Sequence, residues 1–195
     1  MSFAGVDLAA SDRNETGVAI INEGRVKVFS VFSFDEIIDA VKSADTVAVD
    51  APLSLPRGRC CLRNDCSCSR HGHFRRADLE IRRYGSVLPL TWRGMRELTM
   101  RGIRIREALA SHGVDVIETH PRTAERMMKN AELQMELDSH ASAMSIHQRD
   151  ALTAALVALL YSEGNFTELG DPSEGTIILP KVEEPQSKNS SRNQP

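Results

Sequence analysis

Residues 3–32, FAGVDLAASDRNETGVAIINEGRVKVFSVF, consist of three short apolar segments separated by turn-forming residues. The segment Asn22-Glu23-Gly24 is typical of a hairpin turn, because Asn and Gly adopt the backbone angles that tight turns require. Short connections of this kind favour antiparallel pairing of consecutive strands. We therefore expect three antiparallel strands: Phe3–Ala9, Thr16–Ile21 and Val26–Phe32.

After these strands the pattern changes to alternating helices and strands. Ser33 with Glu36 three residues later is a capping-box signature, and apolar residues at helical spacing follow it. Val47–Asp50 is almost entirely apolar, as expected for a central parallel strand covered on both faces. We therefore predict an α/β fold with a mixed five-stranded sheet and helices on both faces. The remaining predicted elements are helices at 76–84, at 91–112, from Pro121 toward Leu137 and at 146–162 after Ser145, a strand at Val114–Glu118, and an edge strand at Gly175–Leu179.

Residues 53–75 interrupt this alternation with Pro, Gly, Arg and Cys and show no periodic pattern. A connection of that length within a compact domain is usually functional. The chain has 195 residues, which is long enough for one sizeable core. We therefore expect one domain over residues 1–180 with an inserted Arg/Cys-rich lobe at about 53–112, followed by a disordered tail at 181–195.

Four acidic residues occupy positions that indicate a metal site. Asp7, Asp50 and Glu118 stand at the ends of predicted apolar strands, and Asp150 stands on the last predicted helix. A carboxylate at the rim of a hydrophobic sheet is costly without a compensating charge, which is often a metal ion. His147 precedes Asp150 by three residues and would project from the same side of the helix. The competing interpretation makes each acid a turn former or a helix cap, and four separate coincidences are then needed.

The predicted topology brings these acids toward one another. Asp7 and Asp50 would lie on neighbouring strands near their carboxyl ends, where open α/β sheets bind ligands. Two divalent ions held by such carboxylates can stabilise both the attacking and the leaving oxygen in phosphodiester cleavage. The pattern therefore favours a Mg²⁺ or Mn²⁺ site. The last helix could approach the sheet closely because it carries the small residues Ala151, Ala154, Ala155 and Ala158.

The net charge is only −3, but it is unevenly distributed along the chain. Residues 57–106 contain 13 Arg, no Lys and four acids, a formal charge of +9, which leaves −12 for the remainder. Such a segment is suited to binding the phosphates of a polyanion, and the alternative is that these Arg form ion pairs with the acidic remainder. The candidate substrate-binding residues are Arg75, Arg76, Arg82 and Arg83.

All four cysteines fall within residues 60–68, and two histidines follow them. In an intracellular protein such a cluster is more often a metal site than a disulfide framework. The candidate zinc ligands are Cys61, Cys66, Cys68 and either His71 or His73. Two alternatives stay open: reduced thiols without a ligand, or oxidised pairs that join Cys60 or Cys61 to Cys66 or Cys68.

The N-terminus lacks the basic and apolar stretches of a secretory signal, and no segment approaches the roughly 20 apolar residues of a membrane span. We therefore expect an intracellular, cytoplasmic protein without a membrane partner. A homodimer is compatible with the sequence.

Four motifs carry a resemblance to a known family: GVDLA at 5–9, VDAPLSLP at 49–56, IETHP at 117–121 and DALTAA at 150–155. They resemble the motifs of a family of uncharacterised predicted nucleases with a ribonuclease H-like fold, classed as a domain of unknown function. The second motif and HxxDAL at 147–152 also look like the acidic motifs of bacterial Holliday-junction resolvases.

The resemblance implies a ribonuclease H-like fold and assigns roles by position. Asp7, Asp50, Glu118 and Asp150 would be metal ligands, and His147 would be a further ligand or a proton-transfer group. Another motif of these predicted nucleases is matched by Arg76-Ala77-Asp78 together with Arg82 or Arg83.

We therefore predict a Mg²⁺- or Mn²⁺-dependent phosphodiesterase that acts on nucleic acid. Its main competitor is a non-catalytic module that binds nucleic acid or protein through a Cys/His zinc lobe. A phosphotransferase of the actin and sugar-kinase type also begins with such a hairpin. It would require a duplicated domain, and the sequence has no internal repeat.

Overall fold

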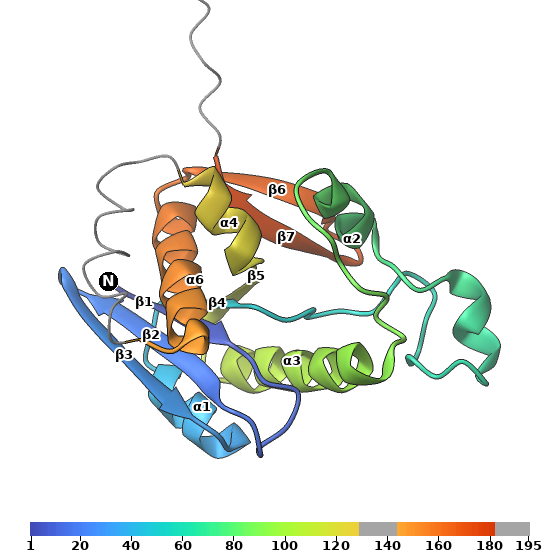
Figure 1. Cartoon of the computed structure of the whole chain (residues 1–195), viewed down its shortest axis with the longest axis horizontal. Coiled ribbons are helices and arrows are strands. Elements are labelled where there is room, and N and C mark those ends of the chain that lie inside the picture. Colours follow the sequence, from blue (N-terminus) through green and yellow to red (C-terminus); the bar gives the residue numbers. More distant parts are fainter. Residues whose placement is uncertain (129–143, 182–195) are drawn as a thin grey trace, which may run out of the picture.

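The computed structural model describes residues 1–128 and 144–181, and within these residues the main sheet has five strands in the order β3-β2-β1-β4-β5 (Figure 1). β1 pairs antiparallel with β2 and parallel with β4, and β5 continues the parallel half. The predicted mixed five-stranded sheet is therefore confirmed. The strands are β1 Ser2–Asp7, β2 Thr16–Asn22, β3 Arg25–Val31, β4 Thr46–Val49 and β5 Asp115–Glu118.

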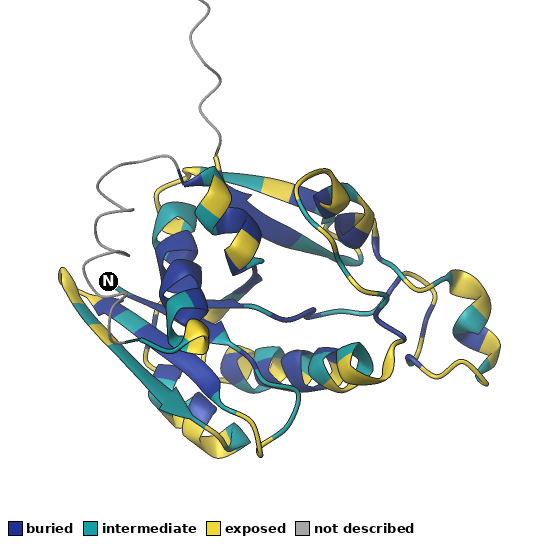
Figure 2. Ribbon diagram, viewed as in Figure 1, coloured by how far each residue is buried: buried dark blue, intermediate teal, exposed yellow. Residues whose placement is uncertain are grey.

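Helices cover both faces of the sheet, because successive residues of a strand point to opposite sides. Phe3 belongs to the core beneath α6 (Ile146–Ser162). Val6 belongs to the core shared with α1 (Phe34–Val41) and α3 (Arg93–Ser111). Figure 2 shows α6 buried along much of its length, as expected for a helix enclosed between the sheet and other elements. The predicted helices on both faces are confirmed.

Two helices begin with the side-chain hydrogen bonds that their sequences predict. At the start of α1, Ser33 Oγ accepts from the Glu36 amide at 3.2 Å and the Glu36 carboxylate accepts from the Ser33 amide at 2.9 Å. At the start of α6, Ser145 Oγ accepts from the Gln148 amide at 3.2 Å, and Gln148 Oε1 accepts from the Ser145 amide at 3.1 Å. These reciprocal bonds satisfy amides that a helix start leaves unpaired, and they fix where α6 begins.

The backbone of α6 lies directly against β1 and β2 because both strands carry a glycine at the contact. A Cβ atom on Gly5 would lie 2.0 Å from the Ala151 carbonyl oxygen, and one on Gly17 would lie 2.1 Å from the His147 carbonyl oxygen. Only residues without a side chain permit so close an approach of helix and sheet. This packing carries His147 and Asp150 to the end of β1.

The predicted strand Gly175–Leu179 is confirmed as β7 (Gly175–Pro180), and it lies outside the five-stranded sheet. It pairs with β6 (Phe166–Asp171), which the sequence did not predict, in a separate two-stranded sheet. β6 contains Gly170 at φ +107°, a feature that weakens its strand signal. A single parallel bridge, Thr119 to Ile178, links this hairpin to the residue that follows β5.

The insertion contains short helical pieces, and its residues 57–72 extend away from the rest of the molecule (Figure 1). The predicted helix 76–84 is an α-helical turn, α2 (Arg76–Glu80), continued by the 3₁₀ turn η2 (Ile81–Arg83). α4 (Pro121–Met127) begins at Pro121 as predicted. Its predicted extension toward Leu137 lies outside the described residues, and so does the predicted tail 181–195 except for Lys181, whose amide donates to the Asn165 carbonyl at 3.1 Å.

Candidate metal centre

Three aspartates from separate segments converge at one end of the sheet. Asp7 is the last residue of β1, and Asp50 directly follows β4, which pairs parallel with β1. The Asp50 amide donates to the Val6 carbonyl at 2.8 Å, so the two strand ends are held together. Asp150 reaches the same point from the first turns of α6. One carboxylate oxygen from each of the three lies within 4.8 Å of the others.

The three carboxylates are held where ionisation is unfavourable. Burial raises the pKa of Asp50 well above its usual range, and the negative charges of Asp7 and Asp150 raise it further. Burial likewise raises the pKa of Asp7 and of Asp150, against the opposing effects of neighbouring His147 and Arg122. A divalent cation at this point would offset both the repulsion between the carboxylates and the cost of their lost hydration.

Two side chains border the aspartates and supply the polar contacts of the site. His147 Nδ1 lies 2.6 Å from Asp7 Oδ2, and nearly half of its side chain is exposed. Arg122 Nε lies 3.6 Å from Asp150 Oδ2, and this guanidinium is largely exposed. Arg122 was not among the predicted site residues. It directly follows Pro121, so it falls in the first turn of the helix predicted after Glu118.

Glu118 is buried and bound to an arginine, and it is not a member of the aspartate cluster. Its Oε1 accepts from Arg75 Nη2 at 2.6 Å, and its Oε2 accepts from Arg75 Nη1 at 2.6 Å and from the Leu53 amide at 2.8 Å. Arg75 also pairs with Asp78 at 2.7 Å. Burial raises the pKa of Glu118, and the Arg75 guanidinium opposes that rise. Both oxygens of Glu118 are therefore already engaged, unlike those expected of a metal ligand.

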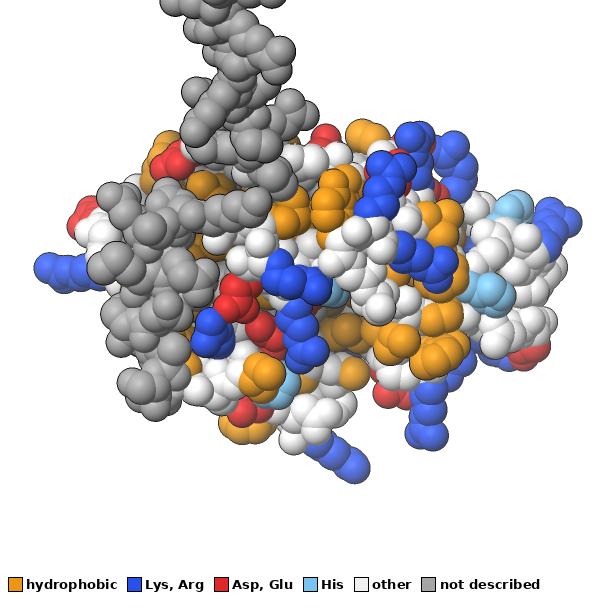
Figure 3. All heavy atoms as spheres, turned by 45° about the horizontal axis from the view of Figure 1, so that its top comes forward, with side chains coloured by type: hydrophobic (Ala, Val, Ile, Leu, Met, Phe, Trp, Pro, Cys, Tyr) orange, Lys and Arg blue, Asp and Glu red, His pale blue; other side chains and the backbone are white. Residues whose placement is uncertain are grey.

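The predicted substrate-binding arginines divide into a buried one and three exposed ones. The Arg75 side chain is fully buried, so as placed it cannot contact a phosphate at the surface. Arg76 is exposed and pairs with Glu80 at 2.7 Å. The Arg82 guanidinium lies 4.1 Å from the centre of the Phe74 ring, and Arg83 is exposed. Figure 3 shows basic side chains around a small acidic patch and further basic side chains along the same face.

A pocket of about 260 Å³ opens beside the aspartates. Its polar lining includes Asp7, Asp50 and His120, and its apolar walls include Leu90 and Met95. The His120 Nδ1 atom is buried and has no hydrogen-bond partner among the described residues. Burial lowers the pKa of His120, so the ring is held neutral at this position. The sequence motif contained His120, but no periodic pattern could show that its Nδ1 atom would be buried without a partner in the wall of a pocket.

The cysteines form a second cluster, whose membership differs from the prediction. The sulfur atoms of Cys60, Cys61, Cys66 and Cys68 all lie within 4.8 Å of one another, so Cys60 takes the place that was expected for a histidine. His71 instead accepts from Arg70 Nε at 3.3 Å, and His73 Nδ1 lies 2.9 Å from Thr91 Oγ1. The reason is local, since His71 is the last residue of η1 (Ser67–His71) and His73 follows it, whereas Cys66 caps the start of η1 and Cys68 lies within it.

The fold and this site define an α/β protein with a mixed five-stranded sheet and a candidate divalent-metal centre at one end of it. Residues 5–142 match the family model described as "Protein of unknown function (DUF429)", and the chain belongs to this family. A search of curated proteins found no match.

A search of solved structures found similarity to "T. thermophilus RuvC in complex with Holliday junction substrate". The sequence identity is 14% and the TM-score is 0.46, with 84% of this chain and 97% of that chain covered. No helix of the described residues is long and apolar enough to cross a membrane.

Proposed function

We propose that this protein is a divalent-metal-dependent nuclease that hydrolyses phosphodiester bonds of nucleic acid. The observation that carries the proposal is the convergence of Asp7, Asp50 and Asp150 from β1, β4 and α6, with oxygens within 4.8 Å of one another. Two carboxylates at the carboxyl ends of parallel strands and a third from α6 offer three hard oxygen donors, which suit Mg²⁺ or Mn²⁺. When bound, such ions would activate water and stabilise the charge that develops on the phosphate.

The residues around the aspartates have separable roles in this proposal. His147 donates from Nδ1 to Asp7 when neutral, which leaves its exposed Nε2 free to accept a proton near the reacting group. Arg122 places an exposed cation next to Asp150, where it would attract a phosphate oxygen. Glu118 and Arg75 form a buried support beneath the site and fix the segment after β4 through the Leu53 amide.

Nucleic acid is the proposed substrate because Lys and Arg side chains surround an acidic patch on the face of the molecule that Figure 3 shows. The exposed arginines Arg82 and Arg83 have no ion-pair partner among the described residues, so they remain available to backbone phosphates. The pocket beside the aspartates has apolar walls, which suit the face of a base or a sugar. These features favour a polyanion over a small phosphate ester.

The test is a cleavage panel of labelled single-stranded, double-stranded and branched DNA and RNA, each with Mg²⁺, Mn²⁺ or chelator. We expect metal-dependent cleavage of at least one substrate by the wild type and its loss in Asp50→Asn. Asp39→Asn is the matched control, because Asp39 is an exposed carboxylate on α1 that pairs with Lys42 and lies outside the aspartate cluster. Metal-independent binding without cleavage of any substrate would overturn the proposal and favour the non-catalytic binding module.

A further inference from the structure

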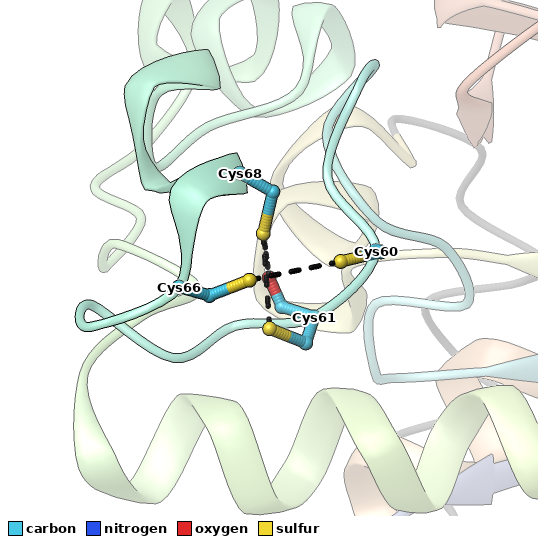
Figure 4. A group of neighbouring side chains, drawn as sticks. All are labelled: Cys60, Cys61, Cys66 and Cys68. Atoms are coloured by element: carbon cyan, nitrogen blue, oxygen red, sulfur yellow. Dashed lines mark hydrogen bonds between the residues drawn. The ribbon is translucent and has the colours of Figure 1, made fainter.

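The four cysteines are brought together by two adjacent segments of the inserted lobe. Cys60 and Cys61 lie on the incoming chain, while Cys66 caps the 3₁₀ turn η1 and Cys68 lies within it. Cys60 Sγ is 3.8 Å from Cys66 Sγ, and Cys61 Sγ is 3.7 Å from Cys68 Sγ. Figure 4 shows all four side chains directed toward a common centre.

These distances are those of four sulfurs around one metal ion. A zinc–sulfur bond is about 2.3 Å long, and the edge of a regular tetrahedron with that radius is about 3.8 Å. The distances in the Cys60–Cys66 and Cys61–Cys68 pairs agree with this edge. A disulfide would need the sulfurs at about 2.05 Å, so the cluster has the spacing of a metal centre and not of two covalent pairs.

We propose that Cys60, Cys61, Cys66 and Cys68 form a closed, structural zinc site of four thiolates. Four protein ligands leave no open coordination position, so the ion would stabilise the lobe and would not perform chemistry. This site is separate from the three aspartates in both ligand type and segment, since thiolates select zinc while carboxylates suit magnesium or manganese.

A buried arginine provides independent support for a negatively charged centre here. Arg59 is buried, and it donates to the Cys61 carbonyl at 3.0 Å, to the Arg63 carbonyl at 3.0 Å and to the Gly72 carbonyl. No carboxylate pairs with it among residues 1–128 and 144–181. A buried cation without a counter-ion is costly, and zinc held by four thiolates carries a net negative charge that would compensate it.

The part of the lobe that holds the cysteines, residues 57–73, also lacks the apolar content needed to fold by itself. Within residues 57–73, all of which are described, the buried side chains are those of Arg59, Leu62 and Cys68. Segments with so small a core usually depend on a metal or on disulfides. Metal binding to such a segment contributes directly to its folding free energy.

The lobe is joined to the wall of the pocket that opens beside the aspartates. The Leu90 amide donates to the His73 carbonyl at 3.1 Å, and His73 Nδ1 contacts Thr91. Leu90 is buried and lines that pocket. Loss of zinc should therefore loosen the pocket wall while the packing of α6 on the sheet persists.

The test is metal analysis of the full chain purified without chelator, with Cys60→Ser and His71→Ala as the matched pair. We expect zinc equimolar with protein for both the wild type and His71→Ala, and a several-fold loss of bound zinc in Cys60→Ser. Cys60 is exposed, so its substitution removes a ligand without opening the main core. As a second measurement, the wild-type chain reconstituted with Co²⁺ should show the intense thiolate-to-metal absorption of a tetrathiolate site.

Three outcomes would overturn the proposal. The first is zinc near zero with all four thiols titrating freely in the native protein. The second is the recovery of two disulfides by mass spectrometry of the unreduced chain. The third is a loss of zinc in His71→Ala that equals the loss in Cys60→Ser, which would assign a ligand set of cysteines with one histidine.

Discussion

His147 Nδ1 lies 2.6 Å from Asp7 Oδ2 and so joins the start of α6 to the end of β1 across 140 residues of sequence. This contact exists because the α6 backbone rests on the sheet at Gly5 and Gly17. A second contact fixes the same helix start, since Glu15 Oε1 accepts from both Ser145 Oγ and Ser30 Oγ at 2.6 Å. The geometry of the aspartate cluster therefore depends on how closely one helix can approach two strands.

Gly17→Ala should displace the start of α6 and weaken metal binding. The new Cβ would lie 2.1 Å from the His147 carbonyl oxygen, so the helix must shift away from β2. We expect a loss of about 2 kcal/mol or more in the free energy of unfolding, as for other overpacked sites. Urea denaturation with and without Mg²⁺ measures both effects.

Gly94→Ala is the control for this substitution. Gly94 lies in the first turn of α3, and a Cβ there has open space around it. Its replacement should leave stability unchanged or slightly raised, because Ala is the better helix former. Equal destabilisation by both substitutions would contradict the role of the close contact between α6 and the sheet.

Asp50→Asn should stabilise the metal-free protein at neutral pH and abolish its response to Mg²⁺. Burial and the charges of Asp7 and Asp150 raise the pKa of Asp50, so ionisation of this group opposes folding. The neutral amide removes that opposition, a gain on the order of 1 kcal/mol. Thermal unfolding in chelator and in Mg²⁺ tests this, and a destabilised Asp50→Asn variant in chelator would contradict it.

Metal-free protein should lose stability as the pH rises from acidic values toward neutral. The folded-state pKa values of Asp7, Asp50 and Asp150 all lie above their ordinary values. Their contribution to the free energy of unfolding is fully present below the pKa of the unfolded state. It is lost as the pH rises through the raised pKa values of the folded state. The stabilisation by Mg²⁺ should grow over the same range, because the ion binds the ionised carboxylates.

Urea titrations in chelator and in Mg²⁺ across this pH range measure the two trends, with Asp39→Asn as control. A stabilisation by Mg²⁺ that is independent of pH would exclude these three groups as its ligands.

Arg75→Ala should destabilise the fold far more than it weakens nucleic-acid binding. Removal of the guanidinium leaves Glu118 and Asp78 buried without a cation, which typically costs about 3–5 kcal/mol. Arg76→Ala is the matched control, since the neighbouring side chain is largely exposed and its pair with Glu80 should contribute less than about 1 kcal/mol. Chemical denaturation of both variants measures the difference, and equal stabilities would show that the buried network is not needed for folding.

The sequence predicts those parts of the fold and site that depend on local pattern. The five main strands, the caps Ser33 and Ser145 and the positions of Asp7 and Asp50 at strand ends all follow from periodicity and capping residues. The pairing of Glu118 with Arg75 could not be predicted, because it joins residues 43 positions apart, and it depends on how α2, η2 and α3 between them pack.

Local sequence pattern also could not predict that Cys60, and not a histidine, is the fourth member of the cysteine cluster. It depends on the path of the chain into η1, which no helical or strand period encodes. β6 was missed for a related reason, since its six residues include Gly170 and carry a weak alternation, and the strand is stabilised by distant segments such as β7.

Arg82→Ala combined with Arg83→Ala should weaken nucleic-acid binding and flatten its dependence on salt. Both side chains are exposed, and neither has an ion-pair partner among the described residues, so they can neutralise backbone phosphates. For every phosphate that is no longer neutralised, the slope of log affinity against log salt should fall by about 0.7 to 0.9. Fluorescence anisotropy with the inactive Asp50→Asn background measures binding without cleavage. Arg93→Ala serves as the control, because Arg93 is also exposed but its Nε lies 3.6 Å from Glu97 Oε1. An unchanged slope in the double variant, with affinity equal to that of the Arg93→Ala control, would place the phosphate path elsewhere on the molecule.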